Sequence, residues 1–273
     1  MMQSTTQNAE NGKPAHIRVQ NLEMRYGDFL IQKDLTFTVN RGDVFVIMGD
    51  SGCGKSTLMR HMIGLHRPAA GQVYYGDTSL WEAEDAARQA ILRKIGILYQ
   101  QGALWSSLTL AENVAMPIEE YTDLPAATIR EVVSFKLALV GLAGFEEYYP
   151  SELSGGMRKR AGLARAMALD PEILFFDEPS AGLDPISAKR LDDLILELAR
   201  SLGTTVIVVT HELASIFAIG NNSVFLDLET KTMIAQGDPK WLRDHASDPH
   251  VRRFLTRGAE AEELRKTERK VKS

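Results

Sequence analysis

The sequence predicts an α/β fold with a parallel-sheet core, an antiparallel β subdomain and an α-helical subdomain. Three observations support this prediction. Short, uninterrupted apolar runs are typical of strands that are covered on both faces. Segments in which apolar and polar residues alternate indicate half-exposed antiparallel strands. A long stretch between Gln100 and Asp177 carries its apolar residues at helical spacing.

The predicted parallel core is made of the apolar runs at residues 44–48, 95–99, 172–176 and 205–209. Periodicity alone does not separate a buried strand from a buried helix, but the short length and the β-branched residues favour strands. The runs are followed by the Gly49 loop, by Gln100, by Asp177 with Glu178, and by Thr210 with His211. Because open α/β sheets bind ligands beyond the carboxyl ends of their strands, we expect these residues to lie near one site.

The other segments are expected to surround this core. Antiparallel strands are predicted over residues 16–26 and 30–39 and for two strands within 223–237. Helices are predicted over 110–121 and 127–142, after Ser154, and over 239–246 and 248–255. The expected organisation is a tail over 1–15, a domain over 16–240 with its helical subdomain over about 101–170, and a C-terminal helical extension with a charged tail over 241–273.

Composition narrows the class of protein. A chain of 273 residues with 44% hydrophobic residues is long enough for one large core. The net charge of −5 argues against a nucleic-acid binder, which usually carries an excess of Lys and Arg. The single cysteine excludes an internal disulfide, and no apolar stretch is long enough to span a bilayer. With no apolar segment typical of a secretory signal in residues 1–15, we expect a soluble, cytoplasmic chain.

Residues 49–57, GDSGCGKST, fit the pattern G-x-x-x-x-G-K-[ST] between a predicted strand and a predicted helix. In such a loop the backbone N–H groups cradle phosphates, Lys55 reaches the β- and γ-phosphates, and the Ser56 hydroxyl binds Mg²⁺. A glycine-rich turn with an incidental lysine is the disfavoured alternative. The predicted nucleotide-binding residues are Gly49, Asp50, Ser51, Gly52, Cys53, Gly54, Lys55, Ser56 and Thr57, of which Cys53 is expected to serve packing.

Four further residues have side chains suited to hydrolysis. Asp177 can hold Mg²⁺, and Glu178 can orient or deprotonate the water that attacks the γ-phosphate. Gln100 can contact the metal and this water, and His211 can donate a hydrogen bond to the γ-phosphate. A carboxylate pair that only caps a strand, and a structural His or Gln, are the alternatives. The predicted metal ligands are Ser56, Gln100 and Asp177, and the predicted catalytic residues are Glu178, His211 and Gln100.

Residues 153–160, LSGGMRKR, place two glycines at the expected start of a helix. Free N–H groups and the helix dipole at that position suit a phosphate. The chain would then have two phosphate-binding segments. The cations that follow, Lys159, Arg160 and Arg165, are expected to be solvated on an exposed helix face rather than to bind phosphate.

The order of these motifs, together with SAGLDP at 180–185, resembles the nucleotide-binding subunit of ATP-binding cassette (ABC) transporters over about residues 16–240. The resemblance implies a P-loop NTPase fold, ATP and Mg²⁺ as ligands, and a head-to-tail homodimer. In that dimer Ser154, Gly155 and Gly156 would contact the nucleotide of the partner subunit. Asp184 would belong to the loop that communicates across the dimer. Tyr26 would stack on adenine, although a Tyr at a strand end more often serves packing.

Three longer segments, 99–118, 158–186 and 248–255, resemble the Mla- and Mce-associated lipid-transport ATPases of bacteria. This resemblance implies a peripheral protein on the cytoplasmic face of the inner membrane that acts with permease subunits and an MCE-type substrate-binding protein. Leu104 and Trp105 would line the groove for a permease helix or belong to the core of the helical insert. Met157 stands where many importers have Gln, which affects only a contact to ribose.

Several alternatives stay open at this stage. Import of amino acids, metals or other small solutes is the second choice of cargo, and the sequence does not fix the direction of transport. A chromosome-maintenance or ribosome-acting ATPase would carry a long coiled coil or a duplicated cassette, and the sequence has neither. A regulatory module without turnover is disfavoured because Gln100, Glu178 and His211 are all present.

Overall fold

The computed structural model describes residues 13–257. Its central sheet has six strands in the order β10-β9-β3-β8-β7-β6. The strands are β3 (Val44–Gly49), β6 (Ile95–Leu98), β7 (Ile173–Asp177), β8 (Thr205–Val209), β9 (Asn222–Leu226) and β10 (Met233–Gln236). All neighbours are parallel except β10, which pairs antiparallel with β9. The predicted parallel core is confirmed, and β9 extends it by pairing with β3 as well as with β10.

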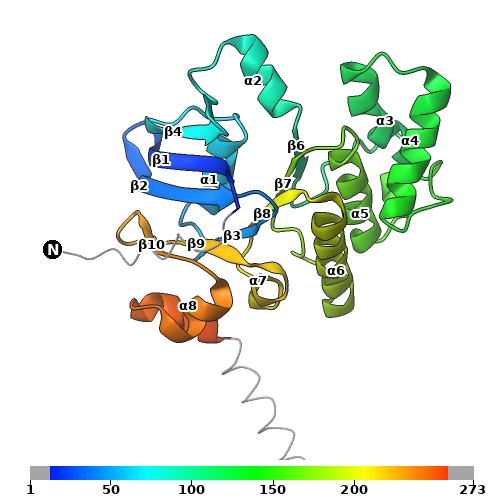
Figure 1. Ribbon diagram of the computed structural model, residues 1–273. Coiled ribbons are helices and arrows are strands. Elements are labelled where there is room, and N and C mark those ends of the chain that lie inside the picture. The colour runs from blue at the N-terminus through cyan, green and yellow to red at the C-terminus, as the bar shows by residue number, and fades with distance from the viewer. Residues whose placement is uncertain (1–12, 258–273) are drawn as a thin grey trace, which may run out of the picture.

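A second, antiparallel sheet has the order β2-β1-β4-β5. Its strands are β1 (Ala15–Tyr26), β2 (Phe29–Asn40), β4 (Ala70–Tyr75) and β5 (Thr78–Ser79). The first two were predicted. Apolar and polar residues do not alternate clearly enough in the sequence to predict β4 and β5. Figure 1 shows this sheet at the upper left, beside the central sheet.

The helices are α1 (Lys55–Met62), α2 (Asp85–Leu92), α3 (Leu110–Tyr121), α4 (Ala126–Leu139), α5 (Gly155–Ala166), α6 (Pro185–Leu202), α7 (Leu213–Ile219) and α8 (Pro239–His245). The predictions did not include α2, α6 and α7. A short 3₁₀ turn, η1 (Pro150–Glu152), precedes α5. Helices α3, α4 and α5 form a group on the side of the central sheet opposite the antiparallel sheet (Figure 1). They lie within the segment predicted to be an α-helical subdomain.

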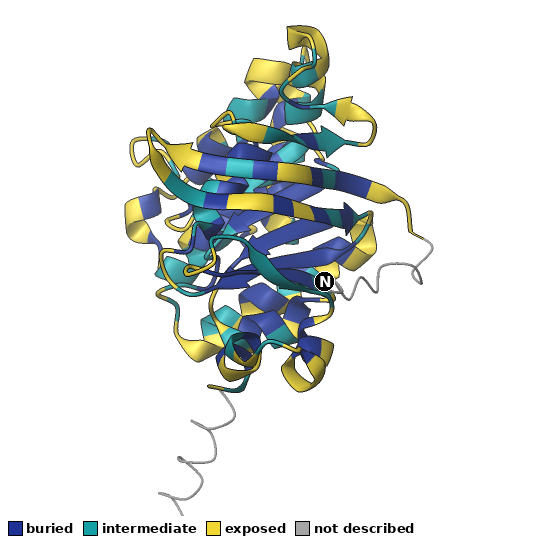
Figure 2. Cartoon of the chain, turned by 90° about the vertical axis from the view of Figure 1, so that its left-hand side faces the viewer, coloured by how far each residue is buried: buried dark blue, intermediate teal, exposed yellow. Residues whose placement is uncertain are grey.

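The apolar runs are continuous because both faces of the central sheet are covered. In β8, Ile207 packs toward the antiparallel sheet and α1, while Val208 packs toward the helical group. In β7, Phe175 and Phe176 face the same two sides, and both are fully buried. The burial colours of Figure 2 show these core strands as a dark layer beneath the striped antiparallel sheet. Each large side chain buried in this way contributes about 1.5–3 kcal/mol to folding.

After α8 the chain forms a further helical stretch over residues 249–257. Its residues Val251, Phe254 and Leu255 are buried in one cluster with Met48 of β3 and Phe225 of β9. This stretch therefore packs on the central sheet as part of the folded domain. Of the predicted tails, residues 1–12 and 258–273 lie outside the described residues, and Ala15 already begins β1.

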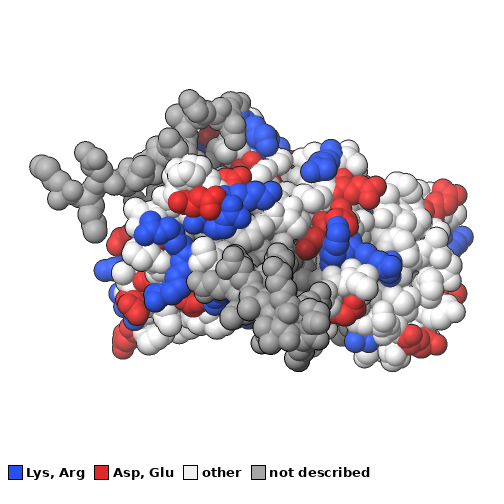
Figure 3. Space-filling view, turned by 90° about the horizontal axis from the view of Figure 1, so that it is seen from below, with Lys and Arg blue, Asp and Glu red and all other residues white. Residues whose placement is uncertain are grey.

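The surface gives two further observations. None of the helices within residues 13–257 is sufficiently long and apolar to cross a membrane. On the face drawn in Figure 3, basic and acidic side chains are interspersed rather than separated.

Candidate functional site

The loop between β3 and α1 needs its glycines for reasons internal to the chain. Gly49 and Gly54 have φ angles of 144° and 100°, which L side chains rarely adopt. A Cβ on Gly49 would lie 2.3 Å from the Leu226 carbonyl oxygen, and one on Gly54 would lie 2.7 Å from Ile31 Cγ2. Beneath the loop, Cys53 is 1% exposed and belongs to the core, which confirms its predicted packing role.

The side chain of Lys55 lies inside this loop. Its ammonium donates hydrogen bonds of 2.9 Å to the carbonyl oxygens of both Gly49 and Asp50. Gln32 of β2 holds the other end of the loop, because its Nε2 donates to the Cys53 carbonyl at 2.7 Å. Ser51 and Gly52 are exposed at the tip of the loop. The loop is thus shaped as a ring of backbone around a cation, which suits a phosphate.

Ser56 and Asp177 come together from α1 and β7. The Ser56 hydroxyl donates a hydrogen bond of 2.8 Å to Asp177 Oδ1. Burial raises the pKa of Asp177, and the hydrogen bond from Ser56 opposes this. One hydroxyl and one carboxylate at this separation fit Mg²⁺, which commonly takes one or two protein oxygens and completes its shell with phosphates and water. Among the described residues no cluster of three His, Cys, Asp or Glu side chains offers a complete metal site.

Glu178 and His211 meet beside this pair. Glu178 has a φ of 48°, and its backbone N–H donates to the Val209 carbonyl at 2.8 Å. Its Oε1 lies 2.7 Å from His211 Nδ1, and its Oε2 accepts a hydrogen bond of 3.2 Å from the Thr210 hydroxyl. The carboxylate is therefore oriented by two side chains from the loop that follows β8. A carboxylate held in this way at the mouth of a phosphate loop can accept a proton from water.

Gln100 lies at the same edge of the sheet but apart from these contacts. Leu98 of β6 pairs with Phe176 of β7, so Gln100 projects beyond the sheet in the register of Glu178. The Gln100 side chain is exposed, and the described residues record no hydrogen bond from it to Ser56, Asp177 or Glu178. Its metal and catalytic roles stay predictions.

The LSGG segment begins α5, as predicted. The Ser154 hydroxyl caps the helix by accepting from the Met157 N–H at 3.3 Å. A Cβ on Gly155 would lie 3.7 Å from Leu183, and one on Gly156 would lie 3.6 Å from Ser187, which are ordinary contacts. Neither glycine has a positive φ. Nothing within the described chain therefore requires glycine at these two positions.

Two more predicted site residues have clear local partners. Asp184 caps α6, because its Oδ1 accepts from the N–H groups of Ile186 and Ser187, both at 3.0 Å. Hydrogen bonds from Ser187 and Ile186 lower the pKa of Asp184. Tyr26 ends β1 with 51% of its surface exposed and meets His66 edge to face. An exposed ring at this position is compatible with stacking.

The prediction that the cations of α5 are solvated is wrong. Lys159 is 6% exposed and donates to the Glu178 carbonyl at 3.2 Å. Arg160 donates to the carbonyls of Val140 and Gly141, while Arg165 donates to those of Gly102 and Ala103. Burial lowers the pKa of all three side chains. They crosslink α5 to neighbouring loops, including the one that follows Gln100.

Leu104 and Trp105 differ in which of the two predicted roles their burial fits. Leu104 packs against the core of the helical group, whereas Trp105 is 58% exposed. The Trp105 backbone is held by Asn113 of α3, whose Oδ1 accepts from its N–H and whose Nδ2 donates to its carbonyl. The exposed indole is thus presented from a fixed backbone.

Gln32 and His250 contact this site but were absent from the predictions, and Thr210 was predicted at the strand end without a role of its own. Gln32 supports the phosphate loop, Thr210 orients Glu178, and His250 contacts Asp50. Each acts on a residue at least 21 positions away in the chain. No local pattern marks such a contact, although Thr210 stands directly before His211 at a strand end.

Comparison with known proteins agrees with this geometry. Residues 32–181 match the model of the ABC transporter family. The chain is 39% identical over 239 residues to the probable ribonucleotide transport ATP-binding protein mkl of Mycobacterium tuberculosis, covering 88% of this chain and 66% of that protein. This chain therefore spans just under two thirds of the mycobacterial relative. It is 38% identical to the intermembrane phospholipid transport system ATP-binding protein MlaF of Haemophilus influenzae, covering 88% of this chain and 89% of that one.

Among solved structures, the chain resembles an ATP-binding cassette in a dimeric, post-hydrolysis state bound to ADP and phosphate. The TM-score is 0.73 with 28% sequence identity, over 81% of this chain and 98% of the other. With 81% of the chain covered at this TM-score, the predicted P-loop NTPase fold of an ABC ATPase is confirmed.

Proposed function

Because the chain belongs to the ABC transporter family, we propose that it binds and hydrolyses MgATP as the ATPase subunit of a membrane transporter. The observation that carries this proposal is the paired contact at the sheet edge. Ser56 with Asp177 suits the metal, and Glu178 with His211 and Thr210 suits the attacking water. Both groups of side chains lie at the carboxyl ends of β3, β7 and β8, where α/β sheets bind ligands.

In the proposed reaction the loop over Gly49–Thr57 binds the phosphates through its N–H groups. Lys55 exchanges its contacts to the Gly49 and Asp50 carbonyls for contacts to the β- and γ-phosphates. Glu178 accepts a proton from the attacking water, and His211 steadies the carboxylate and donates to the γ-phosphate. When bound, Mg²⁺ would supply charge neutralisation at the phosphates, and Ser56, Asp177 and Gln100 would be its protein ligands.

We also propose a head-to-tail homodimer in which Ser154, Gly155 and Gly156 contact the ATP held by the partner subunit. The unforced glycines of this segment support it, because they leave the helix N-terminus open to a ligand from outside the chain. The likeness to a dimeric cassette with bound ADP and phosphate supports it as well. Closure with ATP and reopening after hydrolysis would then drive the membrane partner.

For the cargo we propose phospholipid, moved between or across bacterial membranes through a separate permease with an MCE-type substrate-binding protein. The relative that supports this is a phospholipid transport protein that the chain covers almost fully. The mycobacterial relative, named for ribonucleotide transport, favours small-solute import as the second candidate. The proposed location is the cytoplasmic face of the inner membrane, with the ATPase domain at 16–240, its helical subdomain at 101–170 and the extension from 241.

The test is reconstitution of the full chain with its permease in proteoliposomes. We expect ATP hydrolysis that phospholipid stimulates and ATP-dependent movement of a labelled phospholipid. The Glu178→Gln variant should abolish both while still binding ATP. Movement of a ribonucleotide, an amino acid or a metal ion instead of lipid would overturn the cargo. Absence of hydrolysis in the reconstituted wild type would overturn the ATPase proposal.

A further inference from the structure

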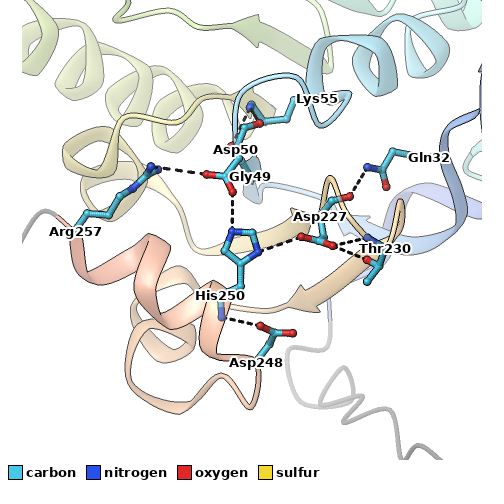
Figure 4. Close-up of polar contacts among 9 residues, drawn as sticks. All are labelled: Gln32, Gly49, Asp50, Lys55, Asp227, Thr230, Asp248, His250 and Arg257. Carbon is cyan, nitrogen blue, oxygen red and sulfur yellow. Dashed lines mark hydrogen bonds and ion pairs between the residues drawn. The ribbon is translucent and has the colours of Figure 1, made fainter.

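The C-terminal helical stretch contacts the phosphate loop of its own chain through His250. Its Nε2 lies 2.6 Å from Asp50 Oδ2, and its Nδ1 lies 3.1 Å from Asp227 Oδ1 (Figure 4). Each ring nitrogen of His250 therefore faces a carboxylate oxygen, so the ring bridges two acidic side chains. Arg257, at the end of the same stretch, places a guanidinium nitrogen 3.8 Å from Asp50 Oδ1.

His250 is itself held firmly in place. Its neighbours Val251, Phe254 and Leu255 are buried in the cluster with Phe225, and the His250 ring meets Phe225 edge to face. The Asp227 carboxylate accepts two hydrogen bonds of 2.7 Å from the Thr230 N–H and hydroxyl. The Asp227 backbone carbonyl accepts from Gln32 Nε2, the same nitrogen that donates to the Cys53 carbonyl. The loop is therefore held at Asp50 and at Cys53 through one connected set of contacts.

The position of Asp50 gives this contact its consequence. Asp50 follows Gly49 directly, and its backbone carbonyl is one of the two that accept from the Lys55 ammonium. Its carboxylate is a negative charge within the loop proposed to hold a triphosphate, where an uncompensated anion opposes binding. The Arg257 guanidinium supplies a compensating cation, and His250 Nε2 contacts the same carboxylate.

We propose that His250 is a positioning residue for the phosphate loop, through which the C-terminal helical stretch sets the nucleotide affinity of its own chain. This inference rests on the proposed ATP site. It predicts that the packing of residues 249–257 on β9 and the binding of ATP are energetically coupled. A partner that displaces the stretch would lower the affinity for ATP, and bound ATP would stabilise the packing of the stretch by the same factor.

The test measures MgATP titrations and steady-state hydrolysis on the full chain with its permease, comparing wild type with His250→Gln. Glutamine preserves bulk and one hydrogen bond but not the second ring nitrogen that faces Asp227. We expect the KM and the Kd for MgATP to rise about tenfold, in the usual range of coupling between sites, with kcat within about twofold of wild type. The matched control is His245→Gln, since His245 is exposed on α8, where it hydrogen-bonds the Trp241 carbonyl and stacks on the Trp241 ring.

The same substitution made in an Asp50→Asn chain separates positioning from general damage. With the carboxylate replaced by an amide, His250→Gln should change the KM by no more than about twofold, because the carboxylate that His250 contacts is gone. If His250→Gln lowers the melting temperature by several degrees, Arg257→Gln becomes the test variant. Arg257 lies at the exposed end of the stretch, and its replacement should raise the KM about threefold.

A His250→Gln chain with unchanged KM and Kd would overturn the inference, as would an equal loss in kcat and affinity or an undiminished effect in the Asp50→Asn background. These outcomes differ from failure of the proposed function, in which wild type itself neither binds nor hydrolyses ATP.

Discussion

Two glycine-containing segments suit phosphate in this chain, and they differ in why they contain glycine. In the β3–α1 loop, Gly49 and Gly54 adopt positive φ, and a side chain at either would collide with Leu226 or Ile31. In the LSGG segment, Gly155 and Gly156 adopt ordinary helical backbone, and a methyl group would make only normal contacts. The fold therefore requires glycine at positions 49 and 54. No contact within the described chain explains the glycines at positions 155 and 156.

The difference teaches that the two segments complete their sites differently. The phosphate loop is complete within its own chain. The Lys55 side chain lies inside it, and Gln32 and His250 contact Cys53 and Asp50 of the loop. At the LSGG segment the helix N-terminus is capped by Ser154 alone, and the two glycines leave room above it. A ligand brought by a second subunit, as proposed above, would account for that room.

The largest expected effect tests whether the LSGG segment meets a partner. In Glu178→Gln the carboxylate that accepts the water proton is lost, while Thr210 and His211 keep hydrogen-bonding partners. We expect hydrolysis to fall by about 10²–10³-fold, typical for loss of a general base, with ATP binding kept and a stable dimer formed. Phosphate release and light scattering with MgATP measure the two effects.

A Glu178→Gln chain that hydrolyses ATP at the wild-type rate would remove Glu178 from its role. If it stays monomeric with ATP even beside its permease, the LSGG segment has no partner nucleotide, and the comparison of the two glycine segments loses its explanation.

The next effect concerns the loop alone. Gly49→Ala places a Cβ 2.3 Å from the Leu226 carbonyl and 2.9 Å from Cys53 Sγ at a φ of 144°. Backbone strain and overpacking together should cost about 3 kcal/mol of unfolding free energy and abolish ATP binding. Urea denaturation and nucleotide titration measure both. Gly52→Ala is the control, because Gly52 has a positive φ of 82° but open space around it and should cost about 1 kcal/mol.

The matching change in the other segment should act in the opposite direction on stability. Gly156→Ala meets only Ser187 at 3.6 Å and replaces a helical glycine, so unfolding free energy should stay equal or rise by up to about 1 kcal/mol. Hydrolysis should fall about tenfold, because the methyl group crowds the partner's triphosphate. Unfolding and phosphate release are measured on one preparation. Hydrolysis at the wild-type rate would mean that the open glycines serve no ligand.

Much of the fold follows from the sequence because its strands are buried on both faces. The four apolar runs need no alternation, and all four form strands of the central sheet. Strand β4 was not predicted because Val73 is its one fully buried residue and no alternation marks it, and β5 has only two residues at the edge of its sheet. Helix α6 was not predicted although its buried residues Leu191, Ile195 and Leu198 recur at helical spacing.

The site was predictable where a motif or a strand end marks it, and not where contacts join distant segments. Ser56 meets Asp177 because both follow strands of one parallel sheet. The cations Lys159, Arg160 and Arg165 could not be placed, because a charge run looks the same in sequence whether it faces water or backbone carbonyls. His250 contacts a residue 200 positions away, and nothing near it in the sequence indicates this.

The smallest expected effect concerns the support behind the LSGG segment. Helix α6, whose Ser187 lies next to Gly156, is anchored to α7 by Asp192, which is 5% exposed. Asp192 Oδ2 accepts from the Ser215 hydroxyl at 2.8 Å, and its buried Oδ1 has no partner within the described residues. Burial raises the pKa of Asp192 to about 6, against the lowering effect of the Ser215 hydrogen bond.

Since the folded pKa exceeds the unfolded value of about 3.9, Asp192 contributes stability that is fully present below about pH 4 and is lost as the pH rises to about 6. The loss should be about 1 kcal/mol, because water can reach Oδ1 once the carboxylate ionises. Asp192→Asn should remove this pH dependence, whereas Asp193→Asn, at an exposed carboxylate paired with Lys189, should retain it. Urea unfolding at pH 4.5 and 7.5 decides, and equal pH dependence in wild type and Asp192→Asn would show that the LSGG support carries no ionisation cost. Of the two glycine-containing segments, the phosphate loop would then be the one whose position depends on a charged side chain, through the contact of Asp50 with His250.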